Sequence, residues 1–260
     1  MGARTVAAAV LAALLLGAPA RAEALPEGFV HLRAVDPTIV QEMRYYGPHN
    51  FIGRPIDGYH APECILTRPA AEALVKVHRE AQASGLLVKV FDCYRPQMAV
   101  DHFIRWSKDV ADQTMKTAFY PNVDKADFFT LGYVAEKSGH SRGSTVDVTL
   151  VPADARAPQT YVPGRTTLVD CRAGYTERFR DNGLDFGTDY DCFDPASHPD
   201  SAAVSTVARH NRAMLAELMG KHGFKPLPEE WWHFTLRDEP FPQTFFNAPV
   251  TAPQGAPAAR

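Results

Sequence analysis

Apolar positions along the first half of the chain predict two helices around one central strand. Residues 70–83 carry apolar side chains at helical spacing, and Thr67 is placed to cap this helix. Ser84-Gly85 ends it, and the short apolar run over residues 86–91 is typical of a central strand. Pro96 then begins a second helix, because proline is favoured in the first turn.

In the second half of the chain, apolar and polar positions alternate less regularly. Residues 145–149 read as a strand that places Asp147 and Thr149 on one face. Residues 152–195 contain many Gly, Pro and Asp residues and predict an extended irregular insertion, whereas residues 201–222 have helical spacing. Residues 231–236 predict a last strand. Helices and strands are mixed without strict alternation, so we expect a single α+β domain with a mainly antiparallel central sheet flanked by helices.

The first 22 residues have the organisation of a secretory signal peptide. Arg4 precedes an apolar run over residues 6–17, and Ala20-Arg21-Ala22 matches the small-residue pattern of a cleavage site. The run is too short to span a bilayer. We therefore expect cleavage after Ala22, export to the periplasm, and a domain over residues 23–246. The Pro/Ala-rich residues 247–260 predict a disordered tail.

Composition narrows the classes of partner. The chain has 260 residues and is 45% hydrophobic, so it can bury a substantial core. Its formal charge is −3 from 27 basic and 30 acidic residues, and loss of Arg4 and Arg21 with the signal peptide leaves −5. A mildly acidic chain has no electrostatic reason to bind nucleic acid or an anionic membrane.

Four cysteines follow the signal peptide, and an even number in an exported protein favours disulfides. Four cysteines allow three pairings. We favour the pairing that closes two short loops, Cys64 with Cys93 and Cys171 with Cys192. Free buried thiols are the alternative for some of them. The lack of any C-x-x-C pair argues against a zinc site made of four cysteines.

Two short segments contain the candidate chemistry. Small residues surround His140, and the following strand directs Asp147, while Glu230 and His233 lie far downstream beside Trp231 and Trp232. Two histidines and one aspartate are the ligand set of a catalytic zinc site with an open position. Glu230 is then free to act as a base. Either histidine alone is weak support for a metal site, since most histidines are surface or core residues. The two tryptophans are equally compatible with core packing and with substrate contact.

Four motifs in the same order resemble the D-alanyl-D-alanine dipeptidases of the VanX type, a branch of the zinc D,D-peptidases that act on peptidoglycan peptides. The similarity extends from about residue 28 to 246. The motifs are residues 92–96 (family pattern D-x-Y-R-P), 138–147 (S-x-H-x-x-G-x-x-x-D), 185–191 (D-M-G-x-x-F-D) and 230–233 (E-x-W-H). Departures are the cysteines, an insertion near residues 153–184, and Phe186 in place of the commoner Met.

The resemblance implies a role for each matching residue. One zinc ion per chain is held by His140, Asp147 and His233 in a cleft on the sheet, and Glu230 is the base. Arg95 stabilises the oxyanion, and Asp92 orients Arg95 or a metal ligand. A dipeptidase must also recognise a free ammonium, and the residues implied in that substrate pocket are Asp191, Ser138 and Tyr45. A surface salt bridge is the alternative for Arg95, and capping of a turn is the alternative for Asp191.

The implied activity is hydrolysis of the dipeptide D-alanyl-D-alanine, in peptidoglycan peptide turnover or in glycopeptide resistance. A D,D-carboxypeptidase or endopeptidase that cleaves longer murein stem peptides is the nearest alternative. A non-catalytic murein-binding module is an alternative from another class, but the sequence retains the three ligands and the base. The sequence does not determine the oligomeric state.

Overall fold

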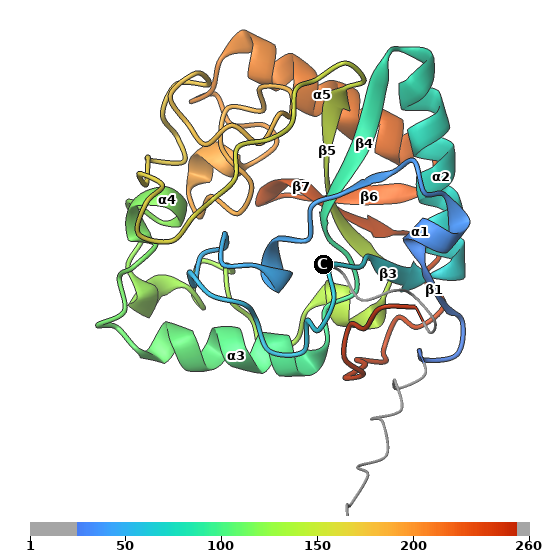
Figure 1. Ribbon diagram of the computed structural model, residues 1–260, viewed down its shortest axis with the longest axis horizontal. Coiled ribbons are helices and arrows are strands. Elements are labelled where there is room, and N and C mark those ends of the chain that lie inside the picture. The colour runs from blue at the N-terminus through green and yellow to red at the C-terminus, as the bar shows by residue number, and fades with distance from the viewer. Residues whose placement is uncertain (1–24, 254–260) are drawn as a thin grey trace, which may run out of the picture.

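A five-stranded sheet forms the centre of the computed structural model, which describes residues 25–253 (Figure 1). The predicted signal peptide lies outside the described residues. The strand order is β2-β4-β5-β7-β6, with β2 parallel to β4 and the other neighbours antiparallel. The strands are β2 (Val40–Gln41), β4 (Leu86–Asp92), β5 (Thr145–Pro152), β6 (Phe224–Leu227) and β7 (Glu230–Leu236). The expected α+β class with a mainly antiparallel sheet is confirmed.

Two long helices cover one face of this sheet, α2 (Arg68–Ala83) and α5 (Thr206–Lys221) (Figure 1). Val146, Val148 and Leu150 point to this side from β5 and are fully buried. Burying each such side chain stabilises the fold by about 1.5–3 kcal/mol. Three short elements lie at the edge of the five-stranded sheet: β1 (Phe29–His31), α1 (Leu32–Val35) and β3 (Ile65–Thr67). Of these, β1 and β3 form a separate two-stranded sheet.

Loops and short helices surround a second apolar core, made largely of aromatic side chains such as Phe51, Phe103 and Trp106. The helices here include α3 (Gln97–Lys108) and α4 (Lys116–Phe119). The part of the chain that the structure describes also contains four short 3₁₀ helices: η1 (Arg44–Tyr46), η2 (Lys125–Asp127), η3 (Gly139–Arg142) and η4 (Pro195–Ser197). Asp147 and Thr149 alternate with Val146, Val148 and Leu150 of β5 and face away from α2 and α5.

Both predicted disulfides are present, Cys64–Cys93 and Cys171–Cys192. The first joins the residue before β3 to the residue after β4. The second joins Cys171 to Cys192, the residue after Asp191, within the irregular insertion. Each closes a loop of 20 to 30 residues, and such a crosslink typically contributes about 2–4 kcal/mol to stability.

Two expectations need correction. Thr67 occupies the N-cap position of α2, but its hydroxyl makes a hydrogen bond with the Ser144 hydroxyl at 2.7 Å and caps nothing. The tail predicted to be disordered from residue 247 is ordered as far as residue 253. Val250 is fully buried and pairs with Tyr59, because a single apolar residue finds a site on the aromatic core.

The irregular insertion packs on a buried polar pair from η1 and its following loop. Arg44 donates hydrogen bonds to Glu42 at 2.6 Å and to Nδ1 of His49 at 2.8 Å. The His49 ring also stacks on Tyr161 of the insertion, with centroids 4.6 Å apart. Since arginine only donates, Nδ1 of His49 must accept, so the imidazole is neutral. Burial and the neighbouring Arg44 lower the pKa of His49 to about 2.

This neutral histidine predicts a pH-dependent loss of stability. Below the unfolded-state pKa of about 6.5, the unfolded chain binds a proton at His49 that the folded chain does not. Because the pKa of His49 is lower in the folded state, its contribution to stability is fully present above the unfolded-state pKa of about 6.5. Below that pH the free energy of unfolding declines by about 1.4 kcal/mol per pH unit. We expect the free energy of unfolding, measured by urea denaturation between pH 4.5 and 6.0, to depend less steeply on pH in His49→Gln than in wild type. Glutamine keeps an acceptor for Arg44. The control His210→Gln removes an exposed imidazole, and an equal change of slope there would contradict this assignment.

Candidate metal centre

The residues on either side of His140 form a tight turn, and this turn positions its side chain. The Ser138 hydroxyl caps η3 by accepting a hydrogen bond from the His140 amide at 3.2 Å. Gly143 ends the turn with φ +81°, and a Cβ there would lie 2.1 Å from the Phe29 ring. Only glycine fits this backbone comfortably. The chain can then enter β5 immediately, which brings Asp147 under the His140 ring.

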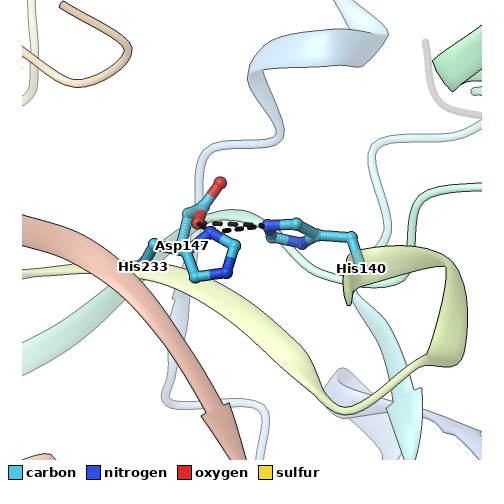
Figure 2. A group of neighbouring side chains, drawn as sticks. All are labelled: His140, Asp147 and His233. Carbon is cyan, nitrogen blue, oxygen red and sulfur yellow. Dashed lines mark hydrogen bonds and ion pairs between the residues drawn. The ribbon is translucent and has the colours of Figure 1, made fainter. Parts of the chain in front are cut away.

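His233 reaches the same point through the register of the sheet. Asp147 of β5 pairs with His233 of β7, and directly opposed residues of antiparallel strands have Cβ atoms about 4.5–5.5 Å apart. Both side chains leave the sheet on the face opposite α2 and α5. Figure 2 shows the three side chains pointing toward one another.

The three donor atoms form a nearly equilateral triangle. Oδ1 of Asp147 lies 3.2 Å from Nε2 of His140 and 3.3 Å from Nδ1 of His233, and the two nitrogens are 3.3 Å apart. Ligands about 2.0–2.1 Å from a tetrahedral ion are separated by roughly 3.3–3.4 Å. These side chains therefore fit one face of a tetrahedral zinc site.

One hydrogen bond on the far side of the His140 ring determines which ring nitrogen is protonated. Its Nδ1 donates to the carbonyl oxygen of Cys93 at 2.7 Å. Since a carbonyl only accepts, the proton is on Nδ1 and the lone pair of Nε2 faces Asp147. Oδ1 of Asp147 is buried and accepts no hydrogen bond from the described residues. Leaving a buried carboxylate oxygen without a donor is costly, and a cation at the centre of the triangle removes that cost.

The charges of the site also favour a cation. Burial acts to raise the pKa of Asp147, but His140 and His233 outweigh it and hold that pKa well below its usual range. Burial likewise acts to lower the pKa of His233, but the carboxylates of Asp147 and Glu230 raise it to about 9. The carboxylates around the triangle therefore stabilise positive charge at its centre.

Glu230 lies beside the triangle and is not one of its corners. Its Oε2 is 3.3 Å from Nδ1 of His233, and its side chain is 17% exposed. The start of β7 places it three residues before His233. Glu230 also lines the same cleft as the triangle, and a carboxylate there can exchange a proton with a water or substrate atom in the cleft.

Arg95 is held on the other side of Asp147. Its Nε and Nη2 lie 3.0 and 2.9 Å from the buried carboxylate of Asp92, and its Nη2 is 3.9 Å from Oδ2 of Asp147. Asp92 is itself fixed by the Tyr59 hydroxyl at 2.6 Å. Arg95 is therefore not in a surface salt bridge. Asp92 contacts Arg95 directly and lies 3.5 Å from Nδ1 of His140, so it adjoins both groups that it was expected to orient.

Asp191 also faces the site. Its backbone has a φ of +60°, which directs its side chain toward Tyr45, and Oδ2 accepts a hydrogen bond from the Tyr45 hydroxyl at 2.8 Å. The carboxyl group is buried and makes no ion pair with any residue in the described range. Burial, together with the negative charges of Asp147 and Glu230, raises the pKa of Asp191 well above its usual range.

Most of these groups line one cleft of about 380 Å³. The predicted site residues that line it are Tyr45, Arg95, Ser138, His140, Asp147, Asp191, Glu230 and His233. Ser138 lies at the edge, with its hydroxyl 3.5 Å from Nη1 of Arg95. Trp231 and Trp232 are core residues: Trp231 stacks on Phe186 with centroids 4.2 Å apart, and Trp232 is 1% exposed.

Two tyrosines contact the site, and no role was predicted for them from the sequence. Tyr59 donates to Asp92, and Tyr190 donates to Oδ2 of Asp147 at 3.0 Å. Tyr190 belongs to one of the four motifs, and Tyr59 lies in a segment rich in Gly, Pro and Asn. The only sequence signal for either role is a tyrosine within these segments. The carboxylate that each hydroxyl contacts lies far away in the chain and is not indicated by the sequence.

Comparisons with known proteins agree with the motifs. The model of the Peptidase_M15 family, described as D-ala-D-ala dipeptidase, matches residues 26–159 and 176–251. The D-alanyl-D-alanine dipeptidase of Enterococcus faecalis is 34% identical over 87% of this chain and its own full length. That of Streptomyces coelicolor is 36% identical over 80% of this chain and 91% of its own. Among solved structures, a mutant of the VanY D,D-pentapeptidase in complex with Zn(II) aligns with 14% identity over 68% of this chain and 76% of its own, at a TM-score of 0.35.

Within residues 25–253, no helix combines the length and the apolar composition that crossing a membrane requires.

Proposed function

The chain belongs to the D-Ala-D-Ala dipeptidase family, and from this premise we propose that it hydrolyses D-alanyl-D-alanine to two molecules of D-alanine with one zinc ion. The residues that would hold the ion are His140, Asp147 and His233. The observation that carries the proposal is the carboxyl group of Asp191, which is buried in the same cleft as the metal triangle without a cationic partner among the described residues.

Glu230 is proposed as the proton carrier. When bound, the zinc ion supplies Lewis-acid activation of water and of the peptide carbonyl. Glu230 accepts a proton from the attacking water and returns it to the departing amine of D-alanine, which requires a carboxylate that reaches both atoms in turn. Its position supports this role, because Oε2 lies 3.3 Å from Nδ1 of His233 and Glu230 lines the same cleft as the triangle.

Arg95 is proposed to stabilise the negative charge that develops on the carbonyl oxygen. Its guanidinium is held at Nε and Nη2 by Asp92, so its orientation is fixed before substrate binds. A preorganised donor of this kind typically contributes about 10²–10³ in rate. The Tyr45 ring below Arg95, with its centroid 5.0 Å from the guanidinium carbon, further limits its movement.

Asp191 is proposed to bind the ammonium group of the substrate. A free amino terminus distinguishes a dipeptide from a longer peptide that ends in the same two residues. Burial and the carboxylates of Asp147 and Glu230 raise the pKa of Asp191, so the groups around it only partly compensate its charged form. An ammonium ion supplies that compensation, and Tyr45 holds the carboxylate in place.

Comparing two substrates tests the proposed function. We expect the purified protein to cleave D-alanyl-D-alanine efficiently and a stem pentapeptide ending in D-alanyl-D-alanine poorly. Asp191→Asn should lower kcat/KM for the dipeptide by roughly 30-fold or more, since breaking a buried charge pair costs about 2–5 kcal/mol. The N-acetylated dipeptide has no ammonium, so the same variant should change its weak turnover far less.

The opposite preference would contradict the proposal. Efficient cleavage of the pentapeptide with little cleavage of the dipeptide would identify a D,D-carboxypeptidase and remove Asp191 from ammonium binding. Equal losses on the free and the acetylated dipeptide would make Asp191 a structural residue that shapes the loop before Cys192.

Export is a further part of the proposal. The expected signal peptide and the two disulfides are consistent with a periplasmic protein. Such a location favours the turnover of released dipeptide over depletion of a cytoplasmic precursor. A mature protein whose mass retains residues 1–22 would contradict export by this route.

A further inference from the structure

The two oxygens of Asp147 have different surroundings. Oδ1 faces the imidazole nitrogens of His140 and His233 and accepts no hydrogen bond from the described residues. Oδ2 points the other way and accepts a hydrogen bond from the Tyr190 hydroxyl at 3.0 Å. The nearest guanidinium nitrogen, Nη2 of Arg95, is 3.9 Å from Oδ2, so Tyr190 is its only hydrogen-bond donor in the described part of the chain.

Tyr190 is itself held rigidly. Its ring stacks on Phe91 of β4, with centroids 4.5 Å apart, and meets the edge of Trp232 at 5.5 Å. The residue is 1% exposed. The left-handed conformation of Asp191 turns the chain directly after Tyr190, and Cys192 anchors it through a disulfide. The hydroxyl therefore has one available position, under the carboxylate of Asp147.

A carboxylate can bind a metal through one oxygen or through both. Zinc in a site with three protein ligands prefers four-coordinate geometry, in which the carboxylate supplies one atom. Oδ2 becomes a second ligand only if the carboxylate rotates, and this rotation breaks its hydrogen bond with Tyr190. Groups that orient a ligand in this way typically affect metal affinity by about 10- to 100-fold.

We propose that Tyr190 is a positioning residue that restricts Asp147 to one ligand oxygen and thereby increases the affinity of the site for zinc. The inference rests on the zinc site of the proposed function but concerns metal binding and not the substrate. Tyr190→Phe removes the hydroxyl and keeps the ring that stacks on Phe91.

The test is the zinc dissociation constant of the metal-free full-length protein, measured by competition with a chromophoric chelator. We expect Tyr190→Phe to bind zinc about 10- to 100-fold more weakly than wild type. Visible absorption of the Co²⁺-substituted proteins reports coordination number, because four-coordinate Co²⁺ absorbs more strongly than five- or six-coordinate Co²⁺. We expect the band to be weaker in the variant, as the released Oδ2 joins the coordination.

A matched control separates this effect from a general loss of packing. Tyr120 is also fully buried, but its hydroxyl has no hydrogen-bond partner among residues 25–253, and its ring packs on Trp106 and Phe128. Tyr120→Phe should leave zinc affinity and the Co²⁺ spectrum unchanged.

Zinc affinity of Tyr190→Phe within threefold of wild type, or an equal loss in both variants, would overturn the positioning role while leaving the proposed dipeptidase activity intact. A wild-type protein that binds no zinc would overturn the metal site and both proposals.

Discussion

Replacing Glu230 with glutamine is expected to lower kcat for D-alanyl-D-alanine by about 10²–10⁴-fold, the usual contribution of a positioned general base. Glutamine has nearly the same shape as glutamate but cannot accept the proton of the attacking water. Glu230 is not one of the three atoms of the metal triangle, so zinc content should remain at the wild-type level. The measurement is steady-state hydrolysis together with the zinc content of the same preparation.

The neighbouring Glu229 offers a matched control. It is exposed and makes no hydrogen bond or ion pair with the described residues, so Glu229→Gln should retain wild-type turnover. Retained activity in Glu230→Gln would remove this residue from the reaction. Loss of zinc in that variant would instead make Glu230 a part of the metal site.

The sequence predicted the centre of the site because its ligands lie in short motifs with local geometry. Asp147 is seven residues after His140, and the intervening turn and strand place both side chains on one side. His233 could be added because the motif around it is specific to a known family. The alternation of β5 likewise identified which of its side chains face the core.

Interactions between distant segments could not be predicted in the same way. Tyr190 and Tyr59 donate hydrogen bonds to carboxylates 43 and 33 residues away, and no spacing rule connects such pairs. The strand β6 was missed because Lys225 and Pro226 weaken its apolar pattern. The order of residues 247–253 depends on Val250 entering a core whose other members lie elsewhere in the chain.

Removing the metal is expected to have the largest effect of all. Two imidazole nitrogens and one carboxylate oxygen form a ligand set that suits zinc, whereas Mg²⁺ and Ca²⁺ prefer oxygen ligands. Treatment with a chelator should therefore abolish hydrolysis of the dipeptide, and Mg²⁺ or Ca²⁺ should not restore it. His140→Ala should stay inactive when zinc is added, because one corner of the triangle is missing.

The central claim is that one zinc ion, held by His140, Asp147 and His233, makes this chain a dipeptidase. Titration of the metal-free protein with zinc, followed by dipeptide hydrolysis, tests it most directly. We expect activity to rise in proportion to added zinc and to reach a plateau at one ion per chain. Full activity of the metal-free protein, or a plateau that requires two ions per chain, would contradict it.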